Sequence, residues 1–159
     1  MNHLPESNTE HYSPIEHVYF ALAGLITGVW VYSVSFHSPI VVDYGTLLER
    51  VWRTYKGEML GRDFDCATTP LTYFIQAVIF KIFSPAVLYQ KLYLAAEMGA
   101  MTWLACLFAR RVLNFSLKTT LVWTATLTAA WAPGLNQMIP WYDVDAIFFS
   151  FLTLCALGM

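Results

Sequence analysis

Long apolar stretches alternate with short polar segments along this chain. The first stretch, Val18 to Phe36, holds 19 residues without a charge. About 20 apolar residues are enough for a helix to cross the hydrocarbon core of a bilayer. Tyr19 and Tyr32 lie near its two ends, as in the aromatic belts of membrane helices. We therefore predict a first transmembrane helix here.

The segment before this stretch is polar. Residues 1–16 contain two prolines and lack the Lys/Arg-rich start of a secretory signal peptide. We predict a disordered tail over 1–16 and a single transmembrane domain over 17–159. The chain ends inside the apolar run from Ala146 to Met159, which is too short to span comfortably. This ending leads us to expect that the domain is truncated, as a piece of a longer protein.

Residues 38–70 are charged and do not form a spanning segment. Within them, apolar residues recur on one face of a helix, namely Leu47, Leu48, Val51, Trp52, Tyr55 and Met59. Charged side chains fall largely on the other face. Such a helix suits the membrane–water interface, although an ordinary solvated helix packed on its neighbours would show the same pattern. Gly57 and Gly61 are expected to end it.

Three further apolar runs follow. Leu71 to Phe80 is short, as in re-entrant or interfacial segments, and we expect the segment up to Phe83 to lie on the membrane surface. Leu92 to Ala109 is a candidate span interrupted by Glu97. A helix from about Lys118 to Trp131 is expected before Pro133-Gly134. The fold class is thus an all-α polytopic membrane protein, with about four transmembrane helices and two interfacial ones.

The composition agrees with a membrane protein. Hydrophobic residues make up 57% and charged residues 13% of the chain, whereas soluble domains carry about 25% charge. Nine Lys+Arg against eleven Asp+Glu give a net charge of −2, which argues against a nucleic-acid partner. The three cysteines and four histidines show no zinc or disulfide spacing. No metal site and no cofactor are therefore expected, apart from a divalent cation at the Asp143/Asp145 pair as a weaker alternative.

Two topologies fit this pattern. If residues 71–83 lie at the interface, Asp43, Asp63, Asp143 and Asp145 share one side of the membrane. If they span, Asp43 and Asp145 face opposite sides. In the spanning arrangement seven basic residues would share a side against Lys81 and Lys91, which the positive-inside rule favours. The short length of the segment favours the interfacial arrangement, and the pattern alone leaves both open.

An ordered set of short motifs distinguishes the two topologies. The set comprises Asp43-x-Gly45, Gly61-Arg62-Asp63-Phe64, Thr69-Pro70-Leu71-Thr72-Tyr73, Phe80-Lys81-Ile82-Phe83, Ala109-Arg110-Arg111 and Asp145-Ala146-Ile147-Phe148-Phe149. In order and spacing it resembles the N-terminal part of GT-C membrane glycosyltransferases, the superfamily of protein O-mannosyltransferases and the lipid A aminoarabinose transferase. The resemblance implies the interfacial arrangement, with a multi-pass integral membrane protein and an active site on the extracytoplasmic face.

The resemblance also implies a reaction. A sugar would move, with inversion, from a polyprenyl-phosphate-linked donor to a lipid, glycan or protein acceptor, and an apolar groove between helices would hold the polyprenyl chain. Membrane lipids would be the other partners. Asp43 and Asp145 would be the catalytic residues, with Asp43 as general base and Asp145 supporting it. Their carboxylates are expected about 6–12 Å apart, by loose analogy with inverting glycosidases.

Other roles are open for the same residues. Asp43 would equally serve as the N-cap of a helix that begins near Thr46, and Asp143 would interact with a helix dipole. Arg62, Asp63 and Asp143 are the candidate substrate-binding residues, because arginine stabilises a phosphate leaving group. Glu97, an ionisable residue within a candidate span, favours an alternative function as a transporter or channel subunit. A non-catalytic membrane assembly subunit is a further alternative.

Overall fold

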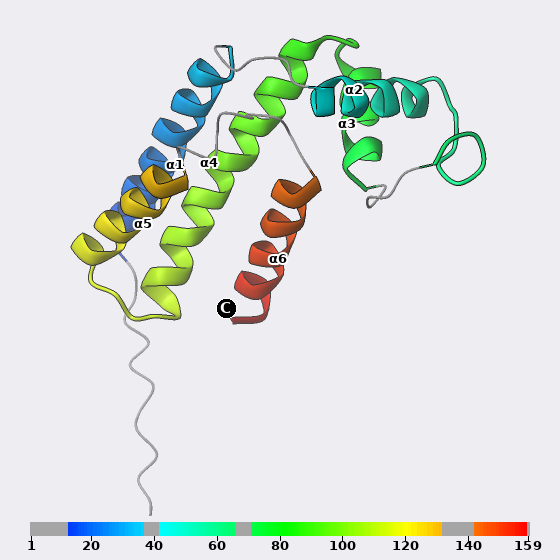
Figure 1. Ribbon diagram of the computed structural model, residues 1–159. Helices are drawn as coiled ribbons and strands as arrows, with labels where there is room; N and C mark the ends of the chain where they lie inside the picture. Colours follow the sequence, from blue (N-terminus) through cyan, green and yellow to red (C-terminus); the bar gives the residue numbers. More distant parts are fainter. Residues whose placement is uncertain (1–12, 37–41, 66–70, 132–141, 159) are drawn as a thin grey trace, which may run out of the picture.

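The computed structural model (Figure 1) describes residues 13–36, 42–65, 71–131 and 142–158, with their side chains except those of 42–44, 130, 131, 142–146 and 158. The described residues form six helices: α1 (Pro14–Ser35), α2 (Val42–Tyr55), α3 (Leu71–Ile82), α4 (Val87–Arg111), α5 (Leu117–Trp131) and α6 (Tyr142–Gly158). They contain no strand beyond an isolated bridge between Leu60 and Phe64. The prediction of an all-α fold is confirmed for this part of the chain.

Two of these helices are long and apolar enough to cross a membrane, α1 with 22 residues and α4 with 25. The apolar parts of α3 and α6 are shorter than a membrane span, and α5 has 15 residues. The described residues therefore contain two candidate membrane spans. The other two of the four expected spans remain a prediction.

The first helix begins earlier than expected. Ser13 is its N-cap and accepts a hydrogen bond from the Ile15 backbone N–H at 3.3 Å, and Pro14 occupies the first turn, where its missing N–H costs nothing. Glu16, also in the first turn, is favoured there by the helix dipole. The predicted tail over residues 1–16 is thus wrong for its last three residues, which are helical.

Helices α1 and α4 are antiparallel neighbours, tied together at both ends. The Lys91 ammonium near the start of α4 donates to the Ser35 carbonyl at the end of α1, at 2.7 Å. At the other end, Arg110 Nε donates to Glu16 Oε1 at 3.2 Å. The chain therefore leaves α1 and enters α4 at the same end of the pair, which is compatible with the interfacial arrangement.

Helices α2 and α3 lie together at that end (Figure 1). In this view α2 extends to one side of the pair, and α3 crosses α2 and leads back toward the start of α4. Among the described residues, α2 contacts α3 but neither α1 nor α4. Whether α3 lies flat on a bilayer stays a prediction. The two helices share a small core of their own, made by Leu47, Val51, Tyr73 and Phe80.

The boundaries of α2 differ in part from those expected. The helix begins at Val42, four residues before Thr46, so Asp43 lies in its first turn and not at an N-cap before it. It ends at Tyr55, and Gly57 and Gly61 follow with φ of +94° and +79°. Backbone with positive φ favours glycine, so the prediction of two helix-breaking glycines is confirmed.

Helices α5 and α6 complete a bundle with α1 and α4 (Figure 1). Ser116 caps α5 by accepting from the Thr119 backbone N–H at 3.2 Å. Helix α6 packs on α4, where Phe151 meets Phe108 edge to face, and it also contacts α3. It begins at Tyr142, so the prediction that Asp143 and Asp145 belong to a helix start is confirmed.

Candidate functional site

The acidic residues expected to share a site occupy the starts of two helices. Asp43 is the second residue of α2, and Asp143 and Asp145 lie in the first turn of α6. The side chains of all three lie outside the described residues. The expected separation of the Asp43 and Asp145 carboxylates therefore stays a prediction.

The backbone places these helix starts at the same end of the bundle. Helix α3 contacts both α2 and α6, and in Figure 1 the start of α6 is its end nearer to α2 and α3. Helix dipoles and free N–H groups make such starts favourable for negative charge. Within the described residues α2 and α6 do not contact each other directly, so a shared site for Asp43 and Asp145 stays a prediction.

Arg62 and Asp63 lie elsewhere. They follow the other end of α2, and a 14-residue helix is about 20 Å long, so α2 itself separates them from Asp43. The two side chains pair with each other, with Arg62 Nη2 at 2.7 Å from Asp63 Oδ2. Asp63 Oδ2 also accepts the Met59 backbone N–H at 2.8 Å. The arginine charge expected for a substrate phosphate is thus engaged within its own loop.

The same contacts set the protonation of this pair. Hydrogen bonds from Arg62 and from the Met59 backbone N–H lower the pKa of Asp63 to about 2, and Asp63 in turn raises the pKa of Arg62. The loop is closed from α2 by Arg53, whose guanidinium donates to the Asp63 carbonyl at 2.7 Å and lies over the Phe64 ring at 4.8 Å. Arg53, Arg62 and Asp63 therefore serve in the first place to stabilise the loop that follows α2.

A group of buried polar side chains links α2, α3 and α4 near the candidate site. Gln90 Nε2 donates to Gln76 Oε1 at 2.7 Å, and both residues are fully buried. Arg50 Nη1 donates to the Tyr73 hydroxyl at 3.4 Å. Glu97, seven residues after Gln90 and so on a similar face of α4, is only 4% exposed.

The sequence analysis did not single out the two glutamines. A signal for them exists, because each lies in or beside an apolar run, where an uncharged amide side chain needs a hydrogen-bonding partner. Such a pattern identifies the residues but not their pairing. The interruption at Glu97, which the analysis did note, marks the same buried region.

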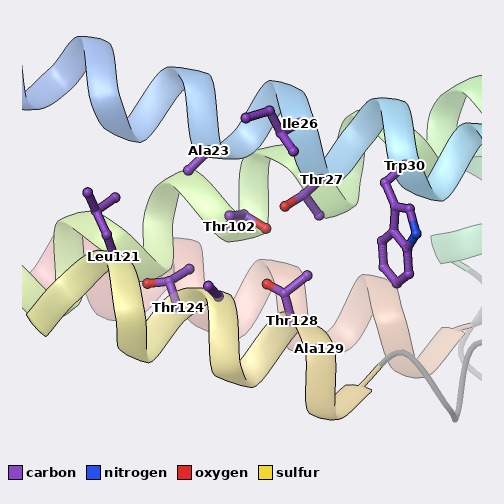
Figure 2. A pocket seen from close by; sticks show the side chains of 10 residues that line it. Ala23, Ile26, Thr27, Trp30, Thr102, Leu121, Thr124, Thr128 and Ala129 are labelled. Carbon is purple, nitrogen blue, oxygen red and sulfur yellow. The ribbon is translucent and has the colours of Figure 1, made fainter. Parts of the chain in front are cut away.

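A cavity of about 420 Å³ lies between α1, α4 and α5. Figure 2 shows Ala23, Ile26, Thr27 and Trp30 of α1 on one side and residues of α5 on the other, with Thr102 of α4 behind. The α5 wall consists of Leu121, Thr124, Ala125, Thr128 and Ala129. The cavity is a lateral groove along the bundle.

The groove is apolar despite its threonines. The Thr102 hydroxyl donates to the Met98 carbonyl at 2.9 Å, and the Thr124 hydroxyl accepts from the Cys106 thiol at 3.5 Å. The surface that lines the groove is mainly apolar. Trp30 stands at the end of the groove nearer to the C-terminal ends of α1 and α5 (Figure 2).

Among the residues that the structure describes, no three His, Cys, Asp or Glu side chains converge on a common point. The Asp143/Asp145 pair, the alternative for a divalent cation, has its side chains outside them. No protein-family model, curated protein or solved structure matches this chain, so the candidate function rests on the chain itself.

Proposed function

We propose that this chain is the N-terminal part of an integral membrane glycosyltransferase. It would transfer a sugar from a polyprenyl-phosphate-linked donor to an acceptor on the extracytoplasmic side. The observation that carries the proposal is the common location of two helix starts. Helices α2 and α6, which bear Asp43 and Asp145, begin at one end of the bundle beside α3.

The bundle offers surfaces that suit a lipid donor. The outward face of α1 exposes a continuous stripe of large apolar side chains, Ile15, Val18, Tyr19, Leu22, Leu25, Ile26 and Val29. Such a stripe is typical of a helix in contact with lipid or a partner and not with water. The groove between α1 and α5 would take part of a polyprenyl chain, with the phosphate toward the end where α2 and α6 begin.

The proposed reaction is a single displacement with inversion, as the resemblance to GT-C enzymes implies. An acceptor hydroxyl attacks the anomeric carbon while the bond from that carbon to the phosphate oxygen breaks. The polyprenyl phosphate departs with the electron pair, and Asp43 takes the hydroxyl proton as general base. Asp145 holds the acceptor side of the site. Arg62 and Asp63, which neutralise each other, contribute to the loop and less directly to phosphate binding.

The experiment compares two aspartates of α2 and its following loop. Membranes containing the full-length protein, of which this chain would be the N-terminal part, are given a polyprenyl-phosphate-linked radiolabelled hexose, and the release of labelled hexose from the donor lipid is measured. Asp43→Asn should lower this release by about 10²–10⁴, as expected for a lost base. If Asp43 only interacts with the helix dipole, the same substitution should change the stability by less than about 1 kcal/mol. Turnover should then stay near normal.

Asp65→Asn is the matched control, because Asp65 is an exposed aspartate of the loop after α2. It should retain turnover. Equal turnover by wild type, Asp43→Asn and Asp145→Asn would contradict the proposal. So would accessibility of engineered cysteines at Gly45 and Ile147 from opposite sides of the membrane, since the two helix starts must share one side.

A transporter or channel subunit is the second candidate, and the burial of Glu97 in α4 favours it. Ionisable residues within membrane helices commonly mark a transport path. A Glu97→Gln variant separates the two functions. It should abolish proton- or cation-coupled flux into vesicles in a transporter, whereas in the enzyme it should leave flux at background.

A further inference from the structure

A second hollow lies between the end of α2 and the outer face of α3. It has a volume of about 220 Å³ and is lined by Thr54, Gly57, Glu58 and Met59 on one side and by Phe74, Ala77, Val78 and Lys81 on the other. We refer to it as the Lys81 recess. It is separate from the groove between α1 and α5 and from the starts of α2 and α6.

The polar groups around the recess are almost all engaged. The Thr54 hydroxyl donates to the Arg50 carbonyl at 2.8 Å, and the Glu58 carboxylate accepts from Arg53 Nε at 2.6 Å. The backbone N–H groups of Gly57 and Glu58 donate to carbonyls in the last turn of α2. Within the described part of the chain, Lys81 has no hydrogen bond or ion pair, so its ammonium is the charge in the recess that lacks a partner.

The walls of the recess continue into an exposed apolar stripe. Leu71, Phe74, Val78 and Ile82 repeat at helical spacing along α3 and are 47–68% exposed. Met59, across the recess, is 53% exposed. A short helix seldom presents so continuous an apolar face to water. The stripe ends beside Lys81, so a cation lies at one end of an apolar track.

We propose that the Lys81 recess binds one anionic phospholipid of the surrounding bilayer. The phosphate lies at the Lys81 ammonium, and an acyl chain follows Val78 and Phe74 along α3. A lysine stem packed on apolar surface with its charge at the headgroup level is the ordinary arrangement at a membrane interface. This site is independent of the proposed glycosyl transfer.

The surrounding charges favour an anionic headgroup over a zwitterionic one. Glu58 pairs with Arg53, which also lies 3.8 Å from Glu49, so these three side chains together carry one negative charge. The Lys56 ammonium lies over the Trp52 ring at 4.7 Å, and it has no acidic partner among the described residues. Lys56 and Lys81 therefore leave the neighbourhood of the recess positive, and basic residues near a membrane surface select anionic lipids.

Native mass spectrometry of the purified protein tests this directly. The protein is taken from bilayers of equal phosphatidylglycerol and phosphatidylcholine, and the lipids retained on it are counted. Wild type should retain one phosphatidylglycerol in preference to phosphatidylcholine. Lys81→Gln should lower that preference about fivefold, the factor that one lysine near an anionic surface supplies. Lys81→Arg should keep it.

Two further variants make the result decisive. Val78→Ser removes a contact of the acyl chain, so it should lower retention of both lipids and leave the preference unchanged. Lys118→Gln removes an exposed lysine at the other end of the bundle and should change neither. All four side-chain changes are at exposed positions, and circular dichroism checks that the helices persist.

Three outcomes would overturn the inference. Equal retention of both lipids by wild type would exclude an anionic site. An equal loss in Lys118→Gln and Lys81→Gln would indicate diffuse attraction by net charge. Unchanged retention in Val78→Ser would exclude an acyl chain along α3.

Discussion

The α1–α4 pair is antiparallel, whereas α2 and α3 cross each other (Figure 1), and the two pairs are held together differently. Helices α1 and α4 approach so closely that their backbones touch. A Cβ added at Gly24 would lie 2.6 Å from the Gly99 carbonyl oxygen, and one added at Gly99 would lie 2.8 Å from that of Gly24. In the α2–α3 pair the contact is made by side chains, and a Cβ at Gly45 of α2 meets nothing within 4 Å.

The ion pairs of the two regions differ in their burial and in what they connect. The Glu16–Arg110 pair ties α1 to α4, and its side chains are only 11% and 19% exposed. The Arg62–Asp63 pair joins neighbouring residues of one exposed loop. The comparison indicates that the two candidate spanning helices form a rigid pair, whose contacts admit little change. The contact between α2 and α3 is made by side chains and is more adjustable.

Breaking the Glu16–Arg110 pair should have the largest effect on stability. Arg110→Gln leaves the Glu16 carboxylate nearly buried without its cation, and loss of one member of a buried pair costs about 3–5 kcal/mol. Arg110 also donates to the Phe115 carbonyl at 3.1 Å, so the turn into α5 loosens as well. Unfolding in mixed micelles with increasing SDS measures the loss.

The matched control is Arg62→Gln, which should leave the global transition almost unchanged because its pair is exposed. Equal losses in the two variants would contradict the proposed contrast between the regions. Removing both charges, with Glu16→Gln and Arg110→Gln together, should recover part of the stability, since no isolated charge then remains.

The same glycine substitution should have opposite signs in the two regions. Gly24→Ala forces α1 away from α4, because the new methyl group would overlap a backbone oxygen, and overpacking costs about 1–3 kcal/mol. Gly45→Ala should stabilise by about 0.5–1 kcal/mol, since alanine is the better helix former and has open space there. The same SDS titration compares them, and destabilisation by both would show that α2 is packed more tightly than described.

The close approach of α1 and α4 also shows where sequence interpretation was incomplete. Gly24 and Gly28 are four residues apart in the first apolar stretch, the spacing of small residues that allows membrane helices to approach. The sequence analysis did not use this signal. The pattern does not say which helix comes close, because the partner Gly99 lies 71 residues further along.

Elements with a strong period were predicted well and boundaries less well. The amphipathic pattern from Leu47 onward predicted α2. The first turn of this helix, which begins at Val42, contains no apolar repeat, so the pattern did not predict where the helix begins. The candidate site was predicted only at the level of helix starts. Arg62 and Asp63 were judged by residue type, and sequence cannot reveal that an arginine is engaged by the acid next to it.

The buried glutamine pair tests the junction between the two regions. Gln76→Leu removes one partner of the Gln76–Gln90 hydrogen bond and leaves the buried Gln90 amide without it, which costs about 1–3 kcal/mol. Replacing both by leucine should be closer to neutral, since no polar group is then buried there. A double-mutant cycle by SDS titration measures the coupling, and additive losses would show that the pair does not link α3 to α4.

The smallest expected effect concerns the exposed pair and depends on pH. The hydrogen bonds from Arg62 and the Met59 backbone N–H hold the pKa of Asp63 at about 2, below the ordinary aspartate value of about 3.9. Because the folded-state pKa is lowered, the stabilisation is present above the ordinary value and is lost as the pH falls through about 2. The side chain is exposed, so the change should be confined to the loop and leave the bundle intact. A ¹³C carboxyl NMR titration should show Asp63 titrating near pH 2, together with the Met59 amide, and Arg62→Gln should raise this midpoint toward the ordinary value. A wild-type midpoint already near 3.9 would mean that the pair does not persist in solution, and Arg62 would then be available to a substrate phosphate after all.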